Sequence, residues 1–179
     1  MVKELVERIR QKDQRAMSQL YQMYIGELSS VCYRYVPSEE DAKDVLQNSF
    51  VKIFTSLPTI DYRSEEALRG WMRRIVVNEA LLFLRERRKL HFEPIMSQTT
   101  IQDDEEPESE QILPDVLHRL VSELPDGYRT VLNLYVFEGC SHRQIAELLG
   151  ITESTSASQL YFAKRLLGRR IKELTDSKR

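Results

Sequence analysis

Residues 141–166 combine the start signals of two helices with a glycine turn between them. Ser141 and Gln144 have the spacing of a capping box, which predicts a helix from about residue 142. Gly150 falls where that helix must end and reverse, and Thr152 can cap a second helix. Two short helices around a glycine turn form the shape that places one helix in a DNA major groove. The segment therefore predicts a helix-turn-helix over about 141–167.

Apolar residues recur at helical spacing through most of the remaining chain. The breaks between these stripes fall at Pro37, Pro58, Pro125 and Gly139. The stripes predict a short amphipathic turn near residues 5–9, and helices over about 16–35, 39–57, 65–89, 116–124 and 131–137. No segment alternates convincingly as a strand would, and we find no internal repeat. The sequence therefore predicts an all-α protein.

The charge distribution divides the chain into two lobes. Residues 91–115 hold eight acidic residues and no Lys or Arg, whereas 1–90 and 116–179 each carry a net charge of +3. The acidic segment has no sustained periodicity and is rich in Asp, Glu, Ser, Thr and Gln, a composition typical of a flexible linker. We therefore expect two small helical domains, 1–90 and 114–179, joined by a flexible acidic linker over 91–113.

Several classes of protein are disfavoured by what the sequence lacks. No apolar run approaches the length of a membrane span, and the charged N-terminus is unlike a signal peptide, so we expect no direct membrane insertion. Cys32 and Cys140 lack metal-ligand spacing and are expected to be buried, reduced thiols of a cytoplasmic protein. No phosphate loop, nucleophile–base pair or zinc spacing occurs, so no cofactor, metal or catalytic residue is predicted.

The second helix of the predicted pair carries the candidate groups for duplex DNA. Residues at the start of such a helix meet base edges, and a glutamine can bond adenine through two atoms. Cations further along the helix suit phosphates. The alternative is a solvated amphipathic helix. The residues expected to contact this DNA are Arg143, Ser154, Thr155, Ser156, Ser158, Gln159, Lys164 and Arg165.

The predicted helix 65–89 carries a second set of candidates. Arg74, Asn78 and Arg85 fall on one stripe, and aromatic and guanidinium groups lie just upstream. Such groups stack on unpaired bases while cations follow the backbone, which favours single-stranded DNA. Trp71 also fits the apolar stripe, so a place in the core is open to it. The candidate set is Tyr62, Arg63, Trp71, Arg74, Asn78, Arg85 and Arg88.

A third surface lies on the predicted helix 39–57, away from its apolar side. Its polar residues are Asp41, Asp44, Gln47, Asn48 and Lys52. An acidic-polar surface repels phosphate, so it suits contact with another protein better than contact with DNA. Ordinary exposure to solvent is the alternative that spacing alone favours.

Three motifs together resemble one family. DAKDVLQNSFVKIF (41–54) and LRGWMRRIVVNEALLFLRERRK (68–89) resemble region 2 of bacterial RNA polymerase sigma factors. LPDGYRTVLNLYVFEGCSHRQIAELLGITESTSASQLYFAKRLL (124–167) resembles region 4. Their order, the short linker and the small size are similar to the extracytoplasmic-function (ECF) subfamily.

The resemblance implies a function for each surface. Asp41, Asp44, Gln47 and Asn48 would dock on the β′ clamp helices of core RNA polymerase. Loop 58–66 and the helix after it would capture the melted minus-ten strand. Region 4 would read the double-stranded minus-thirty-five element and pack on the β flap. An anti-sigma factor is an expected further partner, and the acidic linker is expected to pass near the polymerase active site.

Two other functions compete with this interpretation. A stand-alone helix-turn-helix transcription regulator would explain residues 116–172 but would leave the helix at 65–89 unexplained. A metal-dependent nuclease using the acids at 103–110 would need rigidly placed ligands, and this segment has no His partner. We therefore expect a protein that is not an enzyme.

Overall fold

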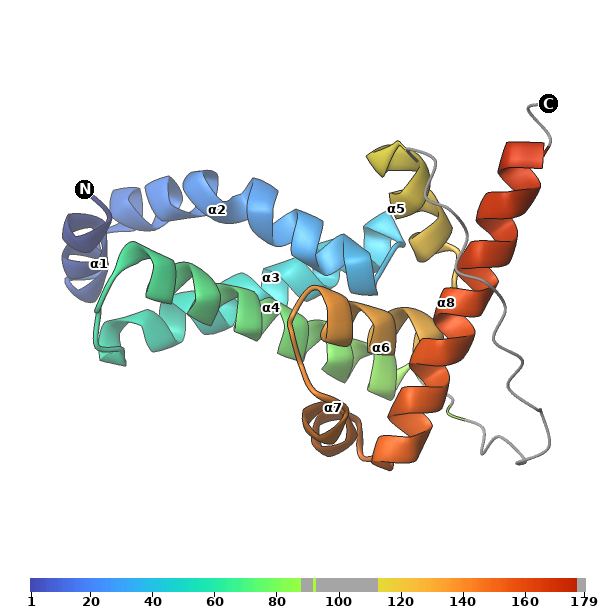
Figure 1. Cartoon of the computed structure of the whole chain (residues 1–179). Helices are drawn as coiled ribbons and strands as arrows, with labels where there is room; N and C mark the ends of the chain where they lie inside the picture. The colour runs from blue at the N-terminus through green and yellow to red at the C-terminus, as the bar shows by residue number, and fades with distance from the viewer. Residues whose placement is uncertain (88–91, 93–112, 177–179) are drawn as a thin grey trace. The chain divides into compact units, whose positions relative to one another are not determined.

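The computed structural model describes residues 1–87, 92 and 113–176, and these contain helices and no strands (Figure 1). The predicted all-α fold is confirmed for this part of the chain. Two compact units are present, Met1–Arg87 and Arg88–Arg179, which we call unit 1 and unit 2. The expected flexible linker at 91–113 lies almost wholly outside the described residues.

Unit 1 contains four α-helices and one short 3-10 helix. The helices are α1 (Val2–Arg10), α2 (Gln14–Tyr35), α3 (Glu39–Ser56) and α4 (Glu65–Glu86), and η1 (Leu57–Thr59) follows α3. Polar side chains start the three longer helices: Asp13 caps α2, Ser38 caps α3 and Ser64 caps α4, each through backbone N–H groups of the first turn. The helix boundaries therefore follow local signals in the sequence.

The core of unit 1 lies where α2, α3 and α4 pack against one another. Its innermost side chains, all less than 2% exposed, include Leu20, Leu28, Ile53, Met72 and Leu84. Each of these positions lies on the apolar stripe that the sequence predicted, which is why three helices with one apolar side each form a closed bundle. α1 packs against α2 and η1 at one end of this bundle.

Unit 2 contains α5 (Pro114–Ser122), α6 (Asp126–Val136), α7 (His142–Leu149) and α8 (Glu153–Asp176). The capping box of Ser141 and Gln144 is present, Gly150 takes a left-handed conformation with φ +66°, and the Thr152 hydroxyl accepts from Thr155 N at 3.0 Å. The predicted helix-turn-helix is confirmed. α8 packs against α5, α6 and α7 and extends nine residues beyond the predicted end at 167.

The two cysteines differ in their surroundings. Cys32 is fully buried in unit 1, and burial raises the pKa of its thiol to about 12. Cys140 is only half-buried, so the expectation of a second buried thiol is wrong in that respect. Within residues 1–87 and 113–176, no helix is long and apolar enough to cross a membrane.

Candidate nucleic-acid and protein interfaces

One side of α4 is exposed along its whole length. Arg74, Asn78 and Arg85 lie on this side, and Ala67, Gly70 and Leu82 continue it between and before them. Their spacings of three and four residues place them in one row on the helix surface. The predicted stripe is therefore accessible. Arg88, the last residue of the predicted set, lies outside the described residues.

Trp71 lies at the border of this exposed row and is half-buried. The sequence left two alternatives open for Trp71, stacking on an unpaired base and a place in the core. Its position is compatible with both, since part of the ring packs in unit 1 and part is accessible. Tyr62 is also half-buried, whereas Arg63 is exposed and forms a 3.7 Å ion pair with Asp61. The aromatic groups thus lie beside the cationic row of α4, near its N-terminal end.

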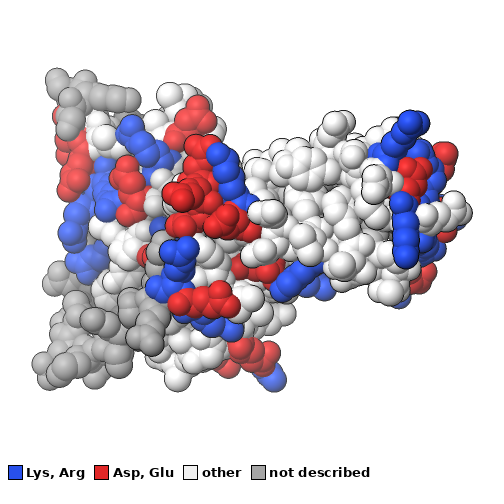
Figure 2. Space-filling model, turned by 180° about the vertical axis from the view of Figure 1, so that it is seen from behind, with Lys and Arg blue, Asp and Glu red and all other residues white. Residues whose placement is uncertain are grey.

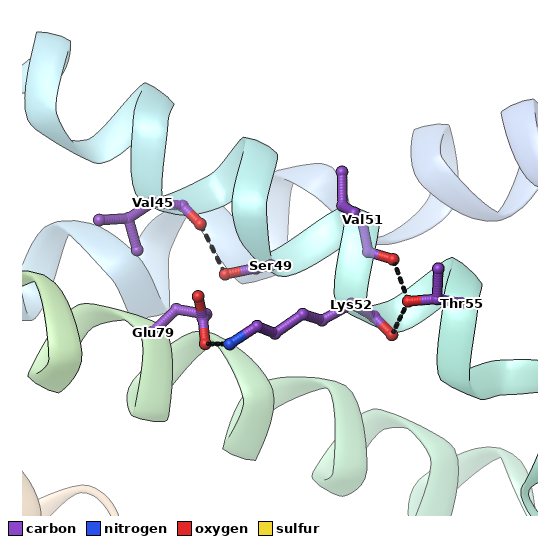
Figure 3. A network of polar contacts seen from close by, with 6 residues as sticks. All are labelled: Val45, Ser49, Val51, Lys52, Thr55 and Glu79. Carbon is purple, nitrogen blue, oxygen red and sulfur yellow. Dashed lines mark hydrogen bonds and ion pairs between the residues drawn. The ribbon is translucent and has the colours of Figure 1, made fainter.

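The opposite side of α4 is tied to α3 by an ion pair that the sequence did not indicate. Figure 3 shows Lys52 of α3 reaching across to Glu79 of α4, where its Nζ donates to Oε1. Glu79 is only 8% exposed, and its neighbour in the chain is Asn78 on the exposed side. A buried carboxylate needs a cation or a proton, so this pair fixes how α4 lies against α3.

The outward side of α3 carries the candidate protein-binding residues. Asp44, Gln47 and Asn48 are exposed, and Asp41 is partly covered, with an Arg87 guanidinium nitrogen 3.9 Å from its carboxylate. Residues 16–26 of α2 and 45–51 of α3 contain no charged residue, and these two helices pack together. Figure 2 shows a broad uncharged area on unit 1 beside the charged α1 end.

A row of aromatic rings lies at that uncharged surface and runs inward from it, since Tyr21 is exposed, Phe54 is half-buried and Phe50 is buried. The rings of Tyr21 and Phe50 have centroids 4.6 Å apart, and those of Phe50 and Phe54 are 5.9 Å apart. Tyr21 and Val51 are exposed beside the polar Gln47 and Asn48. A surface of aromatic and amide groups without charge suits contact with a protein better than contact with phosphate.

Most candidate residues of the helix-turn-helix are accessible. Ser154, Lys164 and Arg143 are exposed, and Thr155, Ser158 and Arg165 are half-buried. The Thr155 hydroxyl lies 2.9 Å from that of Thr152, and Ser158 donates to the Ser154 carbonyl at 2.8 Å. Arg143 has its Nε 3.5 Å from Glu147 on the same helix.

Two candidate residues are not accessible. Ser156 is 0% exposed and Gln159 is 3% exposed. They share one side of α8 with Leu160, Ala163 and Leu167, at the spacing of a helix face that packs on α6 and α7. Ser156 Oγ lies 2.9 Å from His142 Nδ1 of α7. The prediction that Ser156 and Gln159 contact base edges is therefore wrong for this arrangement.

A buried arginine, which the sequence analysis did not single out, connects α5 and α6. Arg129 is 4% exposed and donates to the Leu124 carbonyl at 2.7 Å and the Ser122 carbonyl at 3.3 Å. Its guanidinium also pairs with Asp126. Asp126 and Arg129 have i, i+3 spacing just after a proline, a local signal that could have identified the pair. Elsewhere in the described residues, no three His, Cys, Asp or Glu gather as metal ligands would.

Comparison with known proteins agrees with these two units. The family model "Sigma-70 region 2" matches residues 20–90, and "Sigma-70, region 4" matches residues 115–167. The ECF RNA polymerase sigma-E factor of Haemophilus influenzae is 30% identical over 182 residues, covering 95% of each chain. The chain belongs to the ECF family of RNA polymerase sigma factors. Sigma factors are not enzymes in general.

A second sigma factor relative gives the same assignment. RNA polymerase sigma factor SigV of Bacillus subtilis is 31% identical over 137 residues, which are 76% of this chain and 80% of the relative. A solved structure of CnrH in complex with the cytosolic domain of CnrY overlaps 94% of this chain and 96% of that chain, with 21% identity and a TM-score of 0.49.

Proposed function

We propose that this ECF sigma factor binds core RNA polymerase and promoter DNA, and that its two units divide the work of initiation. The observation that carries the proposal is that region 2 and region 4 matches occur in one chain, in that order. Region 4 alone would suit a stand-alone regulator, but the match over 20–90 gives unit 1 a function that such a regulator leaves unexplained.

In unit 1, the exposed row of α4 receives the melted minus-ten strand. Arg74 and Arg85 neutralise phosphates, Asn78 can bond a base edge, and the accessible parts of Tyr62 and Trp71 offer surfaces for stacking. These interactions gain their full strength only after the bases unpair, because a duplex hides the stacking faces. The row therefore favours the open state of the promoter.

The outward side of α3 and its uncharged surroundings receive core polymerase. Asp41, Asp44, Gln47 and Asn48 dock on the β′ clamp helices. The exposed side chains of Tyr21 and Val51 beside them supply apolar contact. In unit 2, the accessible start of α8 enters the minus-thirty-five major groove, with Ser154, Thr155 and Ser158 near base edges. Arg143, Lys164 and Arg165 meet phosphates, and unit 2 packs on the β flap.

Two regulatory features belong to the same proposal. The protein acts in the cytoplasm, where bacterial polymerase transcribes, and an anti-sigma factor holds it inactive by covering a polymerase-binding surface. The exposed amide and aromatic groups of α2 and α3 support such a contact, because a competitor needs an uncharged surface already built to meet protein.

Reconstituted transcription tests the function directly. Mapping transcription starts after overproduction of the protein gives both promoter elements at once, and purified core polymerase is then combined with the protein on such a promoter. We expect specific transcripts only when both are present. Repression or activation of another holoenzyme, with no transcript from this protein and core polymerase, would support the stand-alone regulator instead.

The variant Arg74→Ala tests the assignment of α4. We expect open-complex formation on duplex promoter to fall about tenfold, because one charged contact to the melted strand is lost. Binding in the closed complex should change little, and a pre-melted template should restore activity. Arg15→Ala, which removes an exposed arginine at the start of α2, is the matched control. Failure of the pre-melted template to rescue Arg74→Ala would show that the single-strand assignment is wrong.

A further inference from the structure

The N-terminal helix α1 lies outside both matched segments, yet it is an integral part of unit 1. Its apolar residues Val2, Leu5, Val6 and Ile9 are all buried. Figure 1 shows α1 beside the connection between α3 and α4, and the helix packs against both α2 and η1, the start of that connection. The helix therefore supports the loop from which Tyr62 and Arg63 project.

One polar contact joins α1 directly to the backbone of this loop. Arg10 donates from Nη2 to the Ile60 carbonyl at 2.7 Å and from Nη1 to Glu7 Oε1 at 2.7 Å. Ile60 is the residue at which η1 ends and the chain becomes extended. A guanidinium held by a carboxylate on one side presents its second donor in a fixed direction, so Glu7 orients the group that holds the loop.

The loop is fixed at its other end as well. The Ser64 hydroxyl accepts from Ala67 N at 3.1 Å and starts α4. Between the two fixed points lie Asp61, Tyr62 and Arg63. Asp61 and Arg63 form a 3.7 Å ion pair with each other, and Tyr62 lies near enough to Tyr24 of α2 to interact with it electrostatically. The segment is therefore a short span whose two ends are set by α1 and α4.

The turn between α1 and α2 keeps Arg10 in place. The Asp13 carboxylate accepts from the Arg8 Nε at 2.9 Å and from the first backbone N–H groups of α2. Lys12 lies between α1 and α2 and has φ +63°, a conformation that non-glycine residues rarely adopt. This left-handed residue keeps the turn tight. α1 therefore cannot follow the loop freely if the loop moves.

We propose that α1 sets the selectivity of minus-ten recognition by positioning the span 61–63 through the contact chain Glu7–Arg10–Ile60. This inference rests on the proposed function, because it assumes that the span meets the melted strand. Arg10 acts here as a positioning residue that touches the loop backbone and not the DNA. Displacing the loop end by a fraction of an ångström misaligns every base contact made from the span, which lowers discrimination more than affinity.

The test compares promoters that differ only in the minus-ten element. A promoter obtained from mapped starts is substituted one position at a time, and open-complex formation with core polymerase is measured for each template. The selectivity is the ratio of open-complex formation on the natural minus-ten element to that on a substituted one. We expect Arg10→Met to lower this ratio about tenfold, because one charge-assisted hydrogen bond is lost. Arg10→Lys keeps a donor and should restore part of the ratio.

Glu7→Gln separates positioning from a phosphate contact, because it removes no cation. If Arg10 positions the loop, Glu7→Gln lowers the ratio in the same direction as Arg10→Met, by a few-fold. Glu4→Gln, an exposed substitution one turn earlier on α1, is the matched control and should leave the ratio unchanged. Thermal unfolding of each variant is measured to check that unit 1 stays folded.

Two outcomes would overturn the proposal. In the first, Arg10→Met lowers open-complex formation equally on all templates and makes it less dependent on salt concentration, while Glu7→Gln has no effect. That result would make Arg10 a phosphate contact. The other is an unchanged ratio in all three variants. Both leave the proposed function intact, since that function fails only if the wild-type protein and core polymerase give no promoter-dependent transcript.

Discussion

The interiors of the two units are built differently. In unit 1, Ser49 and Glu79 are the buried polar residues among many apolar ones, and both have partners: Ser49 donates to the Val45 carbonyl and Glu79 pairs with Lys52 (Figure 3). Among the described residues of unit 2, fewer than half as many apolar residues are buried. Five polar residues accompany them: Arg129, Thr130, Asn133, Ser156 and Gln159.

The difference lies also in how well these polar groups are satisfied. Among the described residues, Thr130 Oγ1 and Gln159 Oε1 of unit 2 are buried without a hydrogen-bond partner. Each such group costs about 1–3 kcal/mol of the free energy of unfolding. Unit 2 thus combines a smaller apolar core with polar groups that weaken it. We infer that unit 1 is the stable part of the free protein, and that unit 2 gains stability when it binds polymerase and DNA.

The variant Arg129→Ala tests this comparison with the largest expected effect. Removing the guanidinium leaves the Leu124 carbonyl and the Asp126 carboxylate without this donor and removes the hydrogen bond from α6 to the Ser122 carbonyl of α5. We expect unit 2 to lose about 3–5 kcal/mol of its free energy of unfolding while unit 1 is unaffected. Denaturant unfolding followed by two signals measures this, since the single tryptophan, Trp71, reports unit 1 and circular dichroism reports both units.

Arg119→Ala is the control for that experiment, because it removes an exposed arginine of α5 from the same unit. It should leave both transitions within about 0.5 kcal/mol of the wild type. If the fluorescence and circular dichroism transitions of Arg129→Ala coincide, the two units unfold together, and the proposed difference in stability does not exist.

The variant Gln159→Leu has a smaller expected effect of opposite sign. Leucine has a similar size and removes a buried amide oxygen that lacks a partner, so unit 2 should gain about 1–2 kcal/mol. Promoter preference should stay unchanged because residue 159 faces the interior of unit 2. Transcription from minus-thirty-five variants checks this second point. A loss of preference at one base pair would show that Gln159 leaves the core to read DNA.

Ser49→Ala provides the comparison in unit 1. Its hydroxyl donates at 2.7 Å to the Val45 carbonyl, which also belongs to the α3 backbone, so its removal should have almost no effect on the free energy of unfolding. A gain equal to that of Gln159→Leu would mean that buried polar groups weaken both units alike.

Local signals in the sequence predicted much of this fold. Ser141 and Thr152 cap the helices at the places expected, because capping depends on residues a few positions apart. The accessible row of Arg74, Asn78 and Arg85 followed equally from helical spacing. These features need no knowledge of which helix packs against which.

The features that the sequence did not reveal depend on contacts between distant residues. Arg10 meets Ile60 and Lys52 meets Glu79 only because the bundle brings them together. Gln159 was assigned to DNA because of its residue type, although Ala163 four residues later lies on the buried side. Helical spacing could have corrected that assignment, whereas the two long-range contacts required the structure.

A further comparison, with expected effects of about 1 kcal/mol or less, concerns one glycine in each unit. Gly150 ends α7 with φ +66°, and a Cβ there would meet no atom within 4 Å. Gly150→Ala should therefore destabilise unit 2 by about 1 kcal/mol through backbone strain alone. Gly26 lies within α2, where a Cβ also meets nothing, so Gly26→Ala should stabilise unit 1 by about 0.5–1 kcal/mol.

The same two unfolding signals distinguish these opposite shifts, because Trp71 follows unit 1. Gly150→Asn is the control, since asparagine accepts the left-handed conformation more readily than alanine and should recover part of the loss. A loss with asparagine as large as with alanine would show that added side-chain atoms, and not φ, disturb the turn. The turn would then be more crowded than the open space around Gly150 indicates.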